Sequence, residues 1–362
     1  MDYTQEAVAT LHDFDGAAPA APIDRSAVVV PMSDRDVGSL AAERLLSSLA
    51  ELDPASVVVP IRAPPDRVTD ALAWVREARP SVRPIWCNGP TLSRTLADRG
   101  LAGETGKGLD VWLAIGTVEA ANVAVHDADV TSHRTRDLER LLAPLAWDVS
   151  FTKGYYARVE DDRLYGRLFR LLYEPLVAAL RDQREGAILA YLDAFRYGLS
   201  GEFAATTAVL RSMSLPRRWG LEVGTLGEAF RLVGAEGSAQ VDLGRYEHDH
   251  RSVSGPGGLS AMASGVAESV LRVVEEAGID PDYGTLADGF VREGEALVDR
   301  YAVDARFNGL TYDEADERDQ VRTYAEAVTP PGSDDRLPPW SSAPLDREAL
   351  VAAVAADLDR VE

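Results

Sequence analysis

The stretch "SAVVVPMSDRDVGSLAAERLLSSLAELDPASVVVPI", residues 26–61, decides the fold. It begins with a short β-branched run, continues with apolar residues at helical spacing, and ends in a second β-branched run. The same alternation continues through "RVTDALAWVREAR" at 67–79 and "VRPIWC" at 82–87. Strands that alternate with amphipathic helices predict a parallel sheet with helices on both faces. Ligands of such α/β sheets bind beyond the carboxyl ends of the strands.

Acidic residues dominate the charge of the chain. Its 362 residues include 59 acidic and 37 basic ones, and the acids are spread through nearly every segment. Such a surface repels nucleic acid and anionic membrane, so we expect neither as a partner. Dispersed acidity is typical of proteins from salt-adapted hosts, where screening over about 3 Å makes self-repulsion tolerable. Only Lys107 and Lys153 are lysines, which suggests places where a compact point charge is wanted, although two residues are a small sample.

Two features of the composition bear on the compartment. No apolar run is long enough to span a membrane, and the acidic start "MDYTQEAVATLHDFDG" is unlike the basic start of a secretory signal. Cys87 is the only cysteine, so it has no partner for an internal disulfide, and we interpret it as a core residue. These features predict a cytoplasmic protein.

The alternation loosens after residue 150. A strand is expected in "VSFTKGYYARV", helices in "RLFRLLYEPLVAALRD" and "LEVGTLGEAFRLVG", and a further strand in "SAQVDLGRYEHDH". The Gly/Ser/Pro stretch "SVSGPGG" at 252–258 separates this body from a helical part. We therefore expect a poorly packed lead-in at 1–25, an α/β body at 26–255 and a mainly helical subdomain at 256–362. Within that subdomain "TPPGSDDRLPPWSSAP", residues 329–344, is predicted to be an exposed loop.

An acidic triplet, "DAD", follows the apolar run "NVAV". In an extended segment residues two apart point the same way, so Asp127 and Asp129 can converge on one hard cation that removes their repulsion. A later strand ends in "YEHDH", which can deliver His248 beside these carboxylates as a third ligand, with Asp249 and His250 as further candidates. In so acidic a chain, a solvated coincidence is the alternative for each.

Three other charged residues stand beside glycine. Lys107 lies between two glycines at a predicted helix start, where backbone N–H groups and an ammonium can meet a phosphate or nucleobase. The surrounding sequence departs from a Walker loop, and an incidental cation at a loop-to-helix turn is the alternative. Glu222 within "GLEVG" is predicted to be partly buried and to need a partner. Glu202 is interpreted as an early-turn acid at a helix N-terminus.

Taken together, these segments resemble the retaining GT-A glycosyltransferases that make glucosyl-3-phosphoglycerate, with a more distant similarity to mannosylglycerate synthases. The resemblance runs in family order from about Val28 to Arg251. The matching segments are a strand ending at Pro31, "GKG" at 106–108, "DAD" at 127–129, "TKGYYAR" at 152–158, "YGRLFRLLYEPL" at 165–176, "LSGEFAATTAVL" at 199–210, "WGLEVGTL" at 219–226 and "AQVDLGRYEHDHR" at 239–251.

The resemblance implies a GT-A fold, which is a Rossmann-like, mostly parallel sheet with helices on both faces, here followed by a helical C-terminal extension. It implies that Asp129 and His248 bind Mg²⁺ or Mn²⁺ and that Glu222 and Arg251 are catalytic. It also implies a nucleoside diphosphate sugar donor. The residues that would bind this nucleotide sugar are Pro31, Met32, Ser33, Asp34, Lys107, Asp127, Ala128, Lys153, Glu222 and Arg251.

The implied activity is transfer of a hexose, glucose above all, to a small anionic acceptor such as 3-phosphoglycerate, with the anomeric configuration kept. A homodimer is implied as well. The residues that would bind the acceptor are Gly166, Arg167, Leu168, Phe169 and His250.

The chain departs from the family pattern at three places. Phe169 stands where the family has threonine, His250 where it has asparagine, and "MSDRD" at 32–36 where it has "ALNEE". The first two changes weaken the case for 3-phosphoglycerate, and the third weakens the case for a particular nucleobase. Three other functions therefore remain open: a catalytically silent nucleotide-sugar-binding protein, a mannosyltransferase that uses GDP-mannose, and a nucleotidyltransferase.

Overall fold

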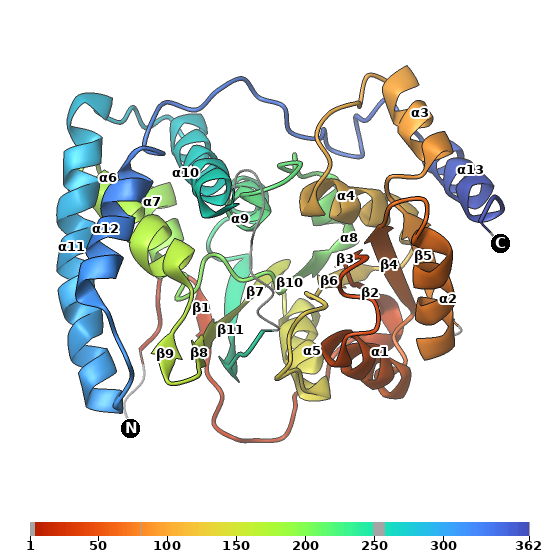
Figure 1. The fold of residues 1–362 in the computed structure, drawn as a ribbon, viewed down its shortest axis with the longest axis horizontal. Coiled ribbons are helices and arrows are strands. Elements are labelled where there is room, and N and C mark those ends of the chain that lie inside the picture. The colour runs from red at the N-terminus through yellow and green to blue at the C-terminus, as the bar shows by residue number, and fades with distance from the viewer. Residues whose placement is uncertain (1–3, 80, 249–257, 362) are drawn as a thin grey trace.

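The computed structural model describes residues 4–79, 81–248 and 258–361, and its centre is a sheet of nine strands (Figure 1). The strand order is β1-β11-β7-β10-β6-β2-β4-β3, with β5 also paired to β4. Every pairing is parallel except those of β10, which runs antiparallel to both β6 and β7. The strands are β1 (Ala9–Leu11), β2 (Ser26–Val29), β3 (Met32–Ser33), β4 (Ser56–Arg62), β5 (Arg83–Trp86), β6 (Asn122–Val125), β7 (Phe151–Ala157), β10 (Phe203–Thr206) and β11 (Ser238–Arg245), and a separate hairpin joins β8 (Val159–Glu160) to β9 (Arg163–Leu164).

Helices cover both faces of the sheet, as the alternation predicts. Successive residues of β2 enter two different cores, because side chains of a strand point to opposite faces in turn. Val28 packs with the helices α1 and α2, whereas Val29 packs with α4. The helices are α1 (Leu40–Leu52), α2 (Val68–Ala78), α3 (Pro90–Asp98), α4 (Lys107–Thr117), α5 (Thr135–Leu142), α6 (Glu174–Gln183), α7 (Ala187–Ala194), α8 (Thr207–Arg211), α9 (Leu221–Val233), α10 (Gly258–Glu276), α11 (Tyr283–Asn308), α12 (Glu314–Ala325) and α13 (Arg347–Leu358).

The N-terminal segment is better packed than expected. Residues 1–25 were predicted to be a poorly packed lead-in, but β1 pairs in parallel with β11 at the edge of the sheet. The Gln5 side chain both donates to the Thr10 carbonyl and accepts from the Thr10 N–H, each at 2.9 Å. This amide therefore covers the outer edge of β1.

The C-terminal third divides between the two sides of the molecule, in contrast to the single subdomain predicted for 256–362. α11 packs against α6 and α12, while α13 packs against α3 at the opposite side (Figure 1). The segment predicted to be an exposed loop runs between them and is held at two points. Leu337 is fully buried and bridged to Leu215, and Trp340 stacks on Trp112 with the ring centroids 4.0 Å apart.

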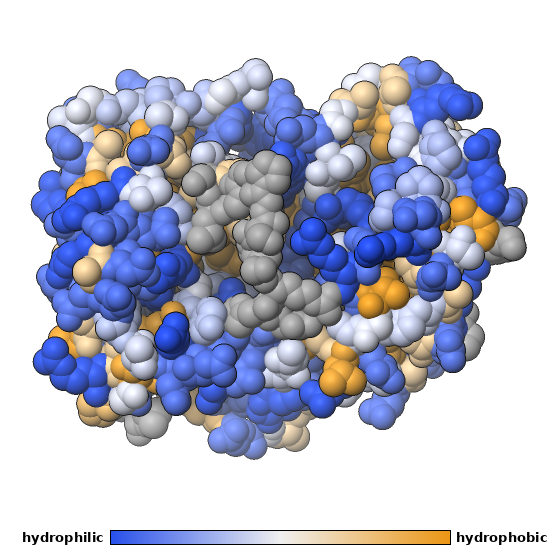
Figure 2. All heavy atoms as spheres, viewed as in Figure 1, coloured by the Kyte–Doolittle hydropathy of each residue, from blue (hydrophilic) through white to orange (hydrophobic). Residues whose placement is uncertain are grey.

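A buried carboxylate fixes the last helix. Asp357 of α13 is fully buried and accepts the backbone N–H groups of Thr91 and Leu92, each at 2.8 Å, at the start of α3. Hydrophilic residues cover most of the face shown in Figure 2. Across the described helices, none combines the length and the apolar character needed to cross a membrane.

Candidate active site

The candidate site lies at the carboxyl ends of β2, β4 and β6. These strands are parallel neighbours, so the residues that follow them meet at one edge of the sheet. Asp127 and Asp129 follow β6, and Lys107 opens α4 above the same edge. A Cβ added to Gly108 would lie only 1.7 Å from the Pro216 carbonyl, so only glycine lets the start of α4 pack this closely.

Lys107 joins two carboxylates from distant parts of the chain. Its Nζ lies 2.7 Å from Asp127 Oδ1 and 3.1 Å from Glu222 Oε1. Burial alone would lower the pKa of Lys107, but the charges of Asp127 and Glu222 outweigh it and raise the pKa well above its usual range. Burial opposes ionisation of Asp127 in turn, yet the Lys107 ammonium keeps the pKa of Asp127 below its usual value. Lys107 therefore stays charged, as its predicted role requires.

The second lysine, Lys153, contacts the backbone of the same glutamate. Lys153 is fully buried in β7, opposite Phe203 of β10, and its Nζ donates to the Glu222 carbonyl at 3.3 Å. Burial, with the charge of Lys107 adding to it, lowers the pKa of Lys153 to about 8. Both lysines of the chain thus converge on Glu222.

Glu222 occupies the first turn of α9, where a carboxylate is favoured by the helix dipole. The preceding Gly220 has a φ of +87°, and a Cβ there would lie 2.0 Å from Ser269 Oγ. The positive φ and the close contact with Ser269 both require glycine at this position. The expected partial burial of Glu222 and its need for a partner are confirmed by Lys107.

An isolated antiparallel bridge between Val130 and His248 places the backbone of His248 beside the residue that follows Asp129. Burial, and then the charges of Asp127 and Asp36, raise the pKa of Asp129 to about 7. The His248 charge helps to lower the pKa of Asp127, which indicates that this imidazole lies close to the acidic triplet. The backbone thus places His248 next to the acidic triplet, and joint metal binding by Asp129 and His248 stays a prediction.

Glu202 belongs to the same cluster, although the sequence predicted only an early-turn acid at a helix N-terminus. It is fully buried, it directly precedes β10, and its Oε2 accepts from Ser200 Oγ at 3.0 Å. Burial, and then the Asp127 charge, raise the pKa of Glu202. The placement before a strand rather than a helix corrects that prediction.

Two histidines, His126 and His133, form a hydrogen-bonded chain that ends at the backbone of the acidic triplet. They were not predicted from the sequence. His126 Nδ1 lies 2.8 Å from the Asp127 carbonyl, His133 Nδ1 lies 3.1 Å from His126 Nε2, and His133 Nε2 lies 2.7 Å from Ser48 Oγ. Because burial lowers the pKa of His133 to about 2, its ring is neutral. Both rings can be neutral if His133 Nδ1–H donates to His126 Nε2 and His126 Nδ1–H donates to the Asp127 carbonyl. The signal in the sequence was that these two histidines lie on either side of the acidic triplet and within a few residues of it.

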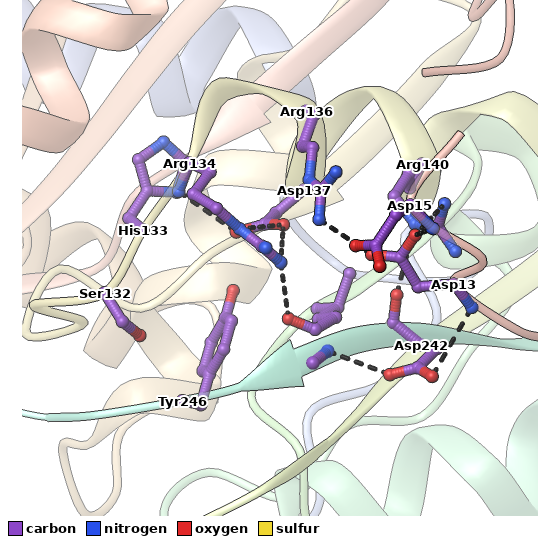
Figure 3. A network of polar contacts seen from close by, with 12 residues as sticks. Asp13, Asp15, Ser132, His133, Arg134, Arg136, Asp137, Arg140, Asp242 and Tyr246 are labelled. Atoms are coloured by element: carbon purple, nitrogen blue, oxygen red, sulfur yellow. Dashed lines mark hydrogen bonds and ion pairs between the residues drawn. The ribbon is translucent and has the colours of Figure 1, made fainter. Parts of the chain in front are cut away.

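Figure 3 shows the contacts that anchor the neighbouring strand end. Arg134 forms an ion pair with Asp137 at 2.8 Å and donates to the Leu243 carbonyl of β11 at 2.8 Å. In the same network Arg136 forms an ion pair with Asp13 at 2.8 Å. These contacts tie α5 and the N-terminal segment to β11, the strand that leads to His248.

A pocket of about 540 Å³ opens beside Glu222. Three arginines line it, together with glutamate and apolar residues. The lining includes Arg158, Arg163, Leu164, Gly166, Arg167, Leu168, Tyr197, Trp219 and Glu222. Gly166, Arg167 and Leu168, which were predicted to bind the acceptor, thus share a pocket with Glu222.

Two of the residues predicted to bind the acceptor make contacts within the protein itself. Phe169 is buried and stacks on Tyr173 and Tyr197, so its side chain belongs to the aromatic core and does not line this pocket. Arg167 already forms ion pairs with Asp316 and Glu317 of α12. Its guanidinium is therefore largely committed to the protein itself.

The residues after β2 are divided between site and core. The Met32 side chain is buried among core residues, so Met32 can contact the nucleotide only through its backbone. Ser33 donates from both its N–H and its hydroxyl to Asp36, and Asp34 forms an ion pair with Arg67 at 3.0 Å. The other positions predicted to bind the nucleotide, Pro31 and Ala128, lie at this edge, whereas Asp249, His250 and Arg251 fall outside the described residues.

Comparisons with known proteins find relatives that span nearly the whole chain. No family model matches the chain. It is 31% identical to the glucosyl-3-phosphoglycerate synthase of Methanococcoides burtonii, over 99% of this chain and 98% of that protein. It is 35% identical to the enzyme of the same name from Persephonella marina, over 70% of this chain and 67% of that protein.

Solved structures show the same fold. Glucosyl-3-phosphoglycerate synthase from Mycobacterium tuberculosis, in complex with phosphoglyceric acid, aligns with a TM-score of 0.57 and 22% identity, over 76% of this chain and 90% of that one. Its complex with Mn²⁺, UDP-glucose and phosphoglyceric acid aligns with the same TM-score. The predicted GT-A fold is confirmed, and this chain belongs to the glucosyl-3-phosphoglycerate synthase family of glycosyltransferases.

Proposed function

We propose that this protein transfers glucose from a nucleoside diphosphate glucose to 3-phosphoglycerate, with a divalent cation and with retention of the anomeric configuration. The observation that carries the proposal is the position of Glu222. This carboxylate touches Lys107 on the side of the acidic triplet and lines the arginine-bearing pocket on the other. It therefore stands where a donor sugar and an acceptor would meet.

The residues present fit a divalent cation. Asp127, Asp129, Asp36 and Glu202 place more negative charge at this edge than Lys107 neutralises, and this excess contributes to the raised pKa of Asp129. Among the described residues no three acidic, histidine or cysteine side chains are grouped so as to hold a metal ion. Mg²⁺ is commonly held by one or two carboxylates together with substrate phosphates.

Asp129 and His248 would thus hold Mg²⁺ or Mn²⁺ jointly with the diphosphate of the donor. When bound, the cation neutralises charge on the diphosphate leaving group. The M. tuberculosis relative has been solved with Mg²⁺ and UDP, and with Mn²⁺ and UDP-glucose.

The donor side relies on fixed positive charge. Lys107 is held between Asp127 and Glu222 and so is positioned before any ligand arrives. A preorganised ammonium stabilises developing negative charge without reorganisation during the reaction. Lys153 holds the carbonyl of Glu222 and thereby fixes the turn that presents this carboxylate to the sugar.

The acceptor side is a cationic pocket. 3-Phosphoglycerate carries a carboxylate and a phosphate, and guanidinium groups bind both with paired N–H donors. Arg167 is engaged by Asp316 and Glu317. Arg158 is hydrogen-bonded to the Tyr197 side chain, and its guanidinium lies 3.9 Å from its acidic neighbour Glu160. We therefore assign the main grip on the acceptor to Arg158, assisted by Arg163 and the Gly166–Arg167 turn.

Retention is proposed to proceed on one face of the sugar. Retaining glycosidases commonly use a free carboxylate nucleophile. Glu222 is instead bound by Lys107, and the buried Glu202 is bound by Ser200. This supports transfer in which the acceptor hydroxyl attacks from the side that the diphosphate leaves. Glu222 would orient the sugar, and Arg251 is proposed to contact the phosphates.

The test is a transfer assay with purified protein, Mn²⁺ and either UDP-glucose, GDP-glucose or GDP-mannose. We expect nucleoside diphosphate release that depends on 3-phosphoglycerate, and a product with the donor's anomeric configuration by NMR. Donor binding without any transfer would support the silent binding protein instead. Transfer only from GDP-mannose would identify a mannosyltransferase. The homodimer, the cytoplasmic location and the salt-adapted host stay predictions.

A further inference from the structure

Arg62 stands at the same edge of the sheet, outside the cluster described above. It is the last residue of β4 and pairs with Ser33 of β3. Its Nε donates to Asp110 Oδ2 at 2.5 Å, and the Asp110 side chain is fully buried while that of Arg62 is 37% exposed. Within the described residues, neither terminal nitrogen of Arg62 has a hydrogen-bond or ion-pair partner. The side chain is therefore fixed at one nitrogen and open at the others.

The anchor of Arg62 is built into the helix that carries Lys107. Asp110 lies three residues after Lys107 in α4, so the two side chains lie on one helix face, about 5–6 Å apart at Cβ. Burial raises the pKa of Asp110 to about 6, and the Arg62 guanidinium opposes that rise. The carboxylate is thus ionised at neutral pH and holds Arg62 in a fixed relation to the diphosphate-binding lysine.

The sheet sets the distance between Arg62 and Asp127. In the order β6-β2-β4, Arg62 ends the strand two places from the one that Asp127 follows. Adjacent strands lie about 4.8 Å apart, so the two strand ends are separated by about 10 Å. That separation suits a nucleotide, whose base and diphosphate lie on opposite sides of a ribose. With the diphosphate at Lys107, beside the acidic triplet, the base would lie at Arg62.

The chemistry of Arg62 then limits which base it accepts. A guanidinium carries only N–H donors and has no acceptor. Uracil and guanine present an exocyclic carbonyl on their recognition edge, whereas cytosine and adenine present an amino group there. We propose that Arg62, held by Asp110, selects nucleotide-sugar donors with an oxo base, uracil or guanine, over those with cytosine or adenine. This inference rests on the proposed function, because it concerns the donor of the same site.

The experiment is calorimetric titration of UDP, GDP, CDP, ADP and inorganic pyrophosphate into the whole protein with Mn²⁺. For the natural protein we expect UDP or GDP to bind about tenfold or more tightly than CDP and ADP, since a good paired contact to a base edge discriminates to that degree. A preference for UDP over GDP, or the reverse, would show which oxo base is the natural one.

The decisive variant is Arg62→Gln. An amide both donates and accepts hydrogen bonds, so it tolerates a base edge with a carbonyl as well as one with an amino group. We expect the preference for oxo bases to disappear while pyrophosphate binds as before. The matched control is Arg83→Gln at the start of β5, where the arginine donates to the Thr117 carbonyl far from this edge, and it should keep the preference. Arg62→Lys retains a cation for Asp110 but lacks the fork of donors, and serves if Arg62→Gln fails to fold.

Several results would overturn the inference. One is equal binding of all four nucleotides by the natural protein, and another is an unchanged preference in both Arg62 variants. A parallel loss of pyrophosphate binding would show that Arg62 acts on phosphate. Failure of the proposed function looks different: oxo nucleotides would still bind selectively, but no sugar would be transferred.

Discussion

Lys153 offers the sharpest test of the site, because its burial links stability to pH. Burial lowers its pKa to about 8 from the usual 10.5, so between these values the unfolded chain binds a proton that the folded protein does not. Stability therefore rises with pH across this window. The difference of about 2.5 pH units corresponds to about 3 kcal/mol. At pH 7 Lys153 is protonated in both the folded and the unfolded state, so its burial destabilises the fold by the full cost of about 3 kcal/mol.

The substitution Lys153→Met keeps the volume of the side chain and removes its charge. At pH 7 it should stabilise the fold by about 2 kcal/mol, which is the relieved cost less about 1 kcal/mol for the hydrogen bond to the Glu222 carbonyl. Near pH 10.5 only the lost hydrogen bond remains, so the variant should be slightly less stable than the natural protein. Transfer activity should fall at both pH values, because the turn that presents Glu222 loses its anchor.

The assay is urea unfolding at a series of pH values from 7 to 10.5, paired with the transfer assay. Lys107→Met is the matched control, because the pKa of Lys107 is raised above its usual value and its proton stays bound across this window. Removing Lys107 removes an interaction that is present at pH 7, so that variant should lose stability. It should keep most of the pH slope, because burial is the main cause of the lowered pKa of Lys153. If Lys153→Met is strongly destabilised at pH 7 and its slope matches the natural protein, the account of the buried ammonium is wrong.

Four other substitutions test three separate parts of the account. Asp129→Ala and His248→Ala should each abolish metal-dependent transfer while circular dichroism shows an intact fold, and full turnover of either in chelator would contradict the metal assignment. Arg158→Gln should raise the KM for 3-phosphoglycerate about tenfold or more, because a charged contact to the acceptor is lost. The KM for the donor is the internal control. An unchanged acceptor KM would show that Arg158 does not belong to the site. Asp357→Ala should lower the free energy of unfolding by about 2–3 kcal/mol, whereas exposed Asp359→Ala should not, and equal stabilities in urea would refute the capping role.

The first half of the fold was predictable because each local pattern carries its own signal. The β-branched run at Ser26–Val29 is followed by a helix with a Ser39 cap and then by β4, so the parallel pairing follows from the connections. The antiparallel β10 gave no such signal, because its four residues sit between glycine-rich and helical segments. Nothing in periodicity alone reveals a reversed strand of that length.

The errors at the two ends have one physical cause. β1 is short and stands before an alanine- and proline-rich stretch, and the segment before α13 is rich in proline and polar residues. Composition of this kind predicts loops. Both segments nevertheless dock through a few side chains that meet distant partners, Thr10 with Gln240 and Trp340 with Trp112. Such contacts depend on the assembled tertiary structure.

The site was predictable where residues follow strand ends. Asp127 and Asp129 were expected at the ligand-binding edge, because they follow a strand of the parallel sheet, whereas Lys107 was expected only at a helix start. The ion pair between Arg62 and Asp110 was missed, because Asp110 lies in an apolar helix and Arg62 in no recognised motif. The engagement of Arg167 by α12 was also missed, since it joins parts of the chain about 150 residues apart.

The most direct test of the central claim is the binding of Mn²⁺ followed by electron paramagnetic resonance, with and without UDP. Because the protein is proposed to supply only Asp129 and His248, we predict weak binding of Mn²⁺ alone and binding about tenfold or more tighter once the diphosphate is present. His248→Ala should lose the tight binding. Equally tight Mn²⁺ binding without nucleotide, or tight binding that survives His248→Ala, would contradict the shared site.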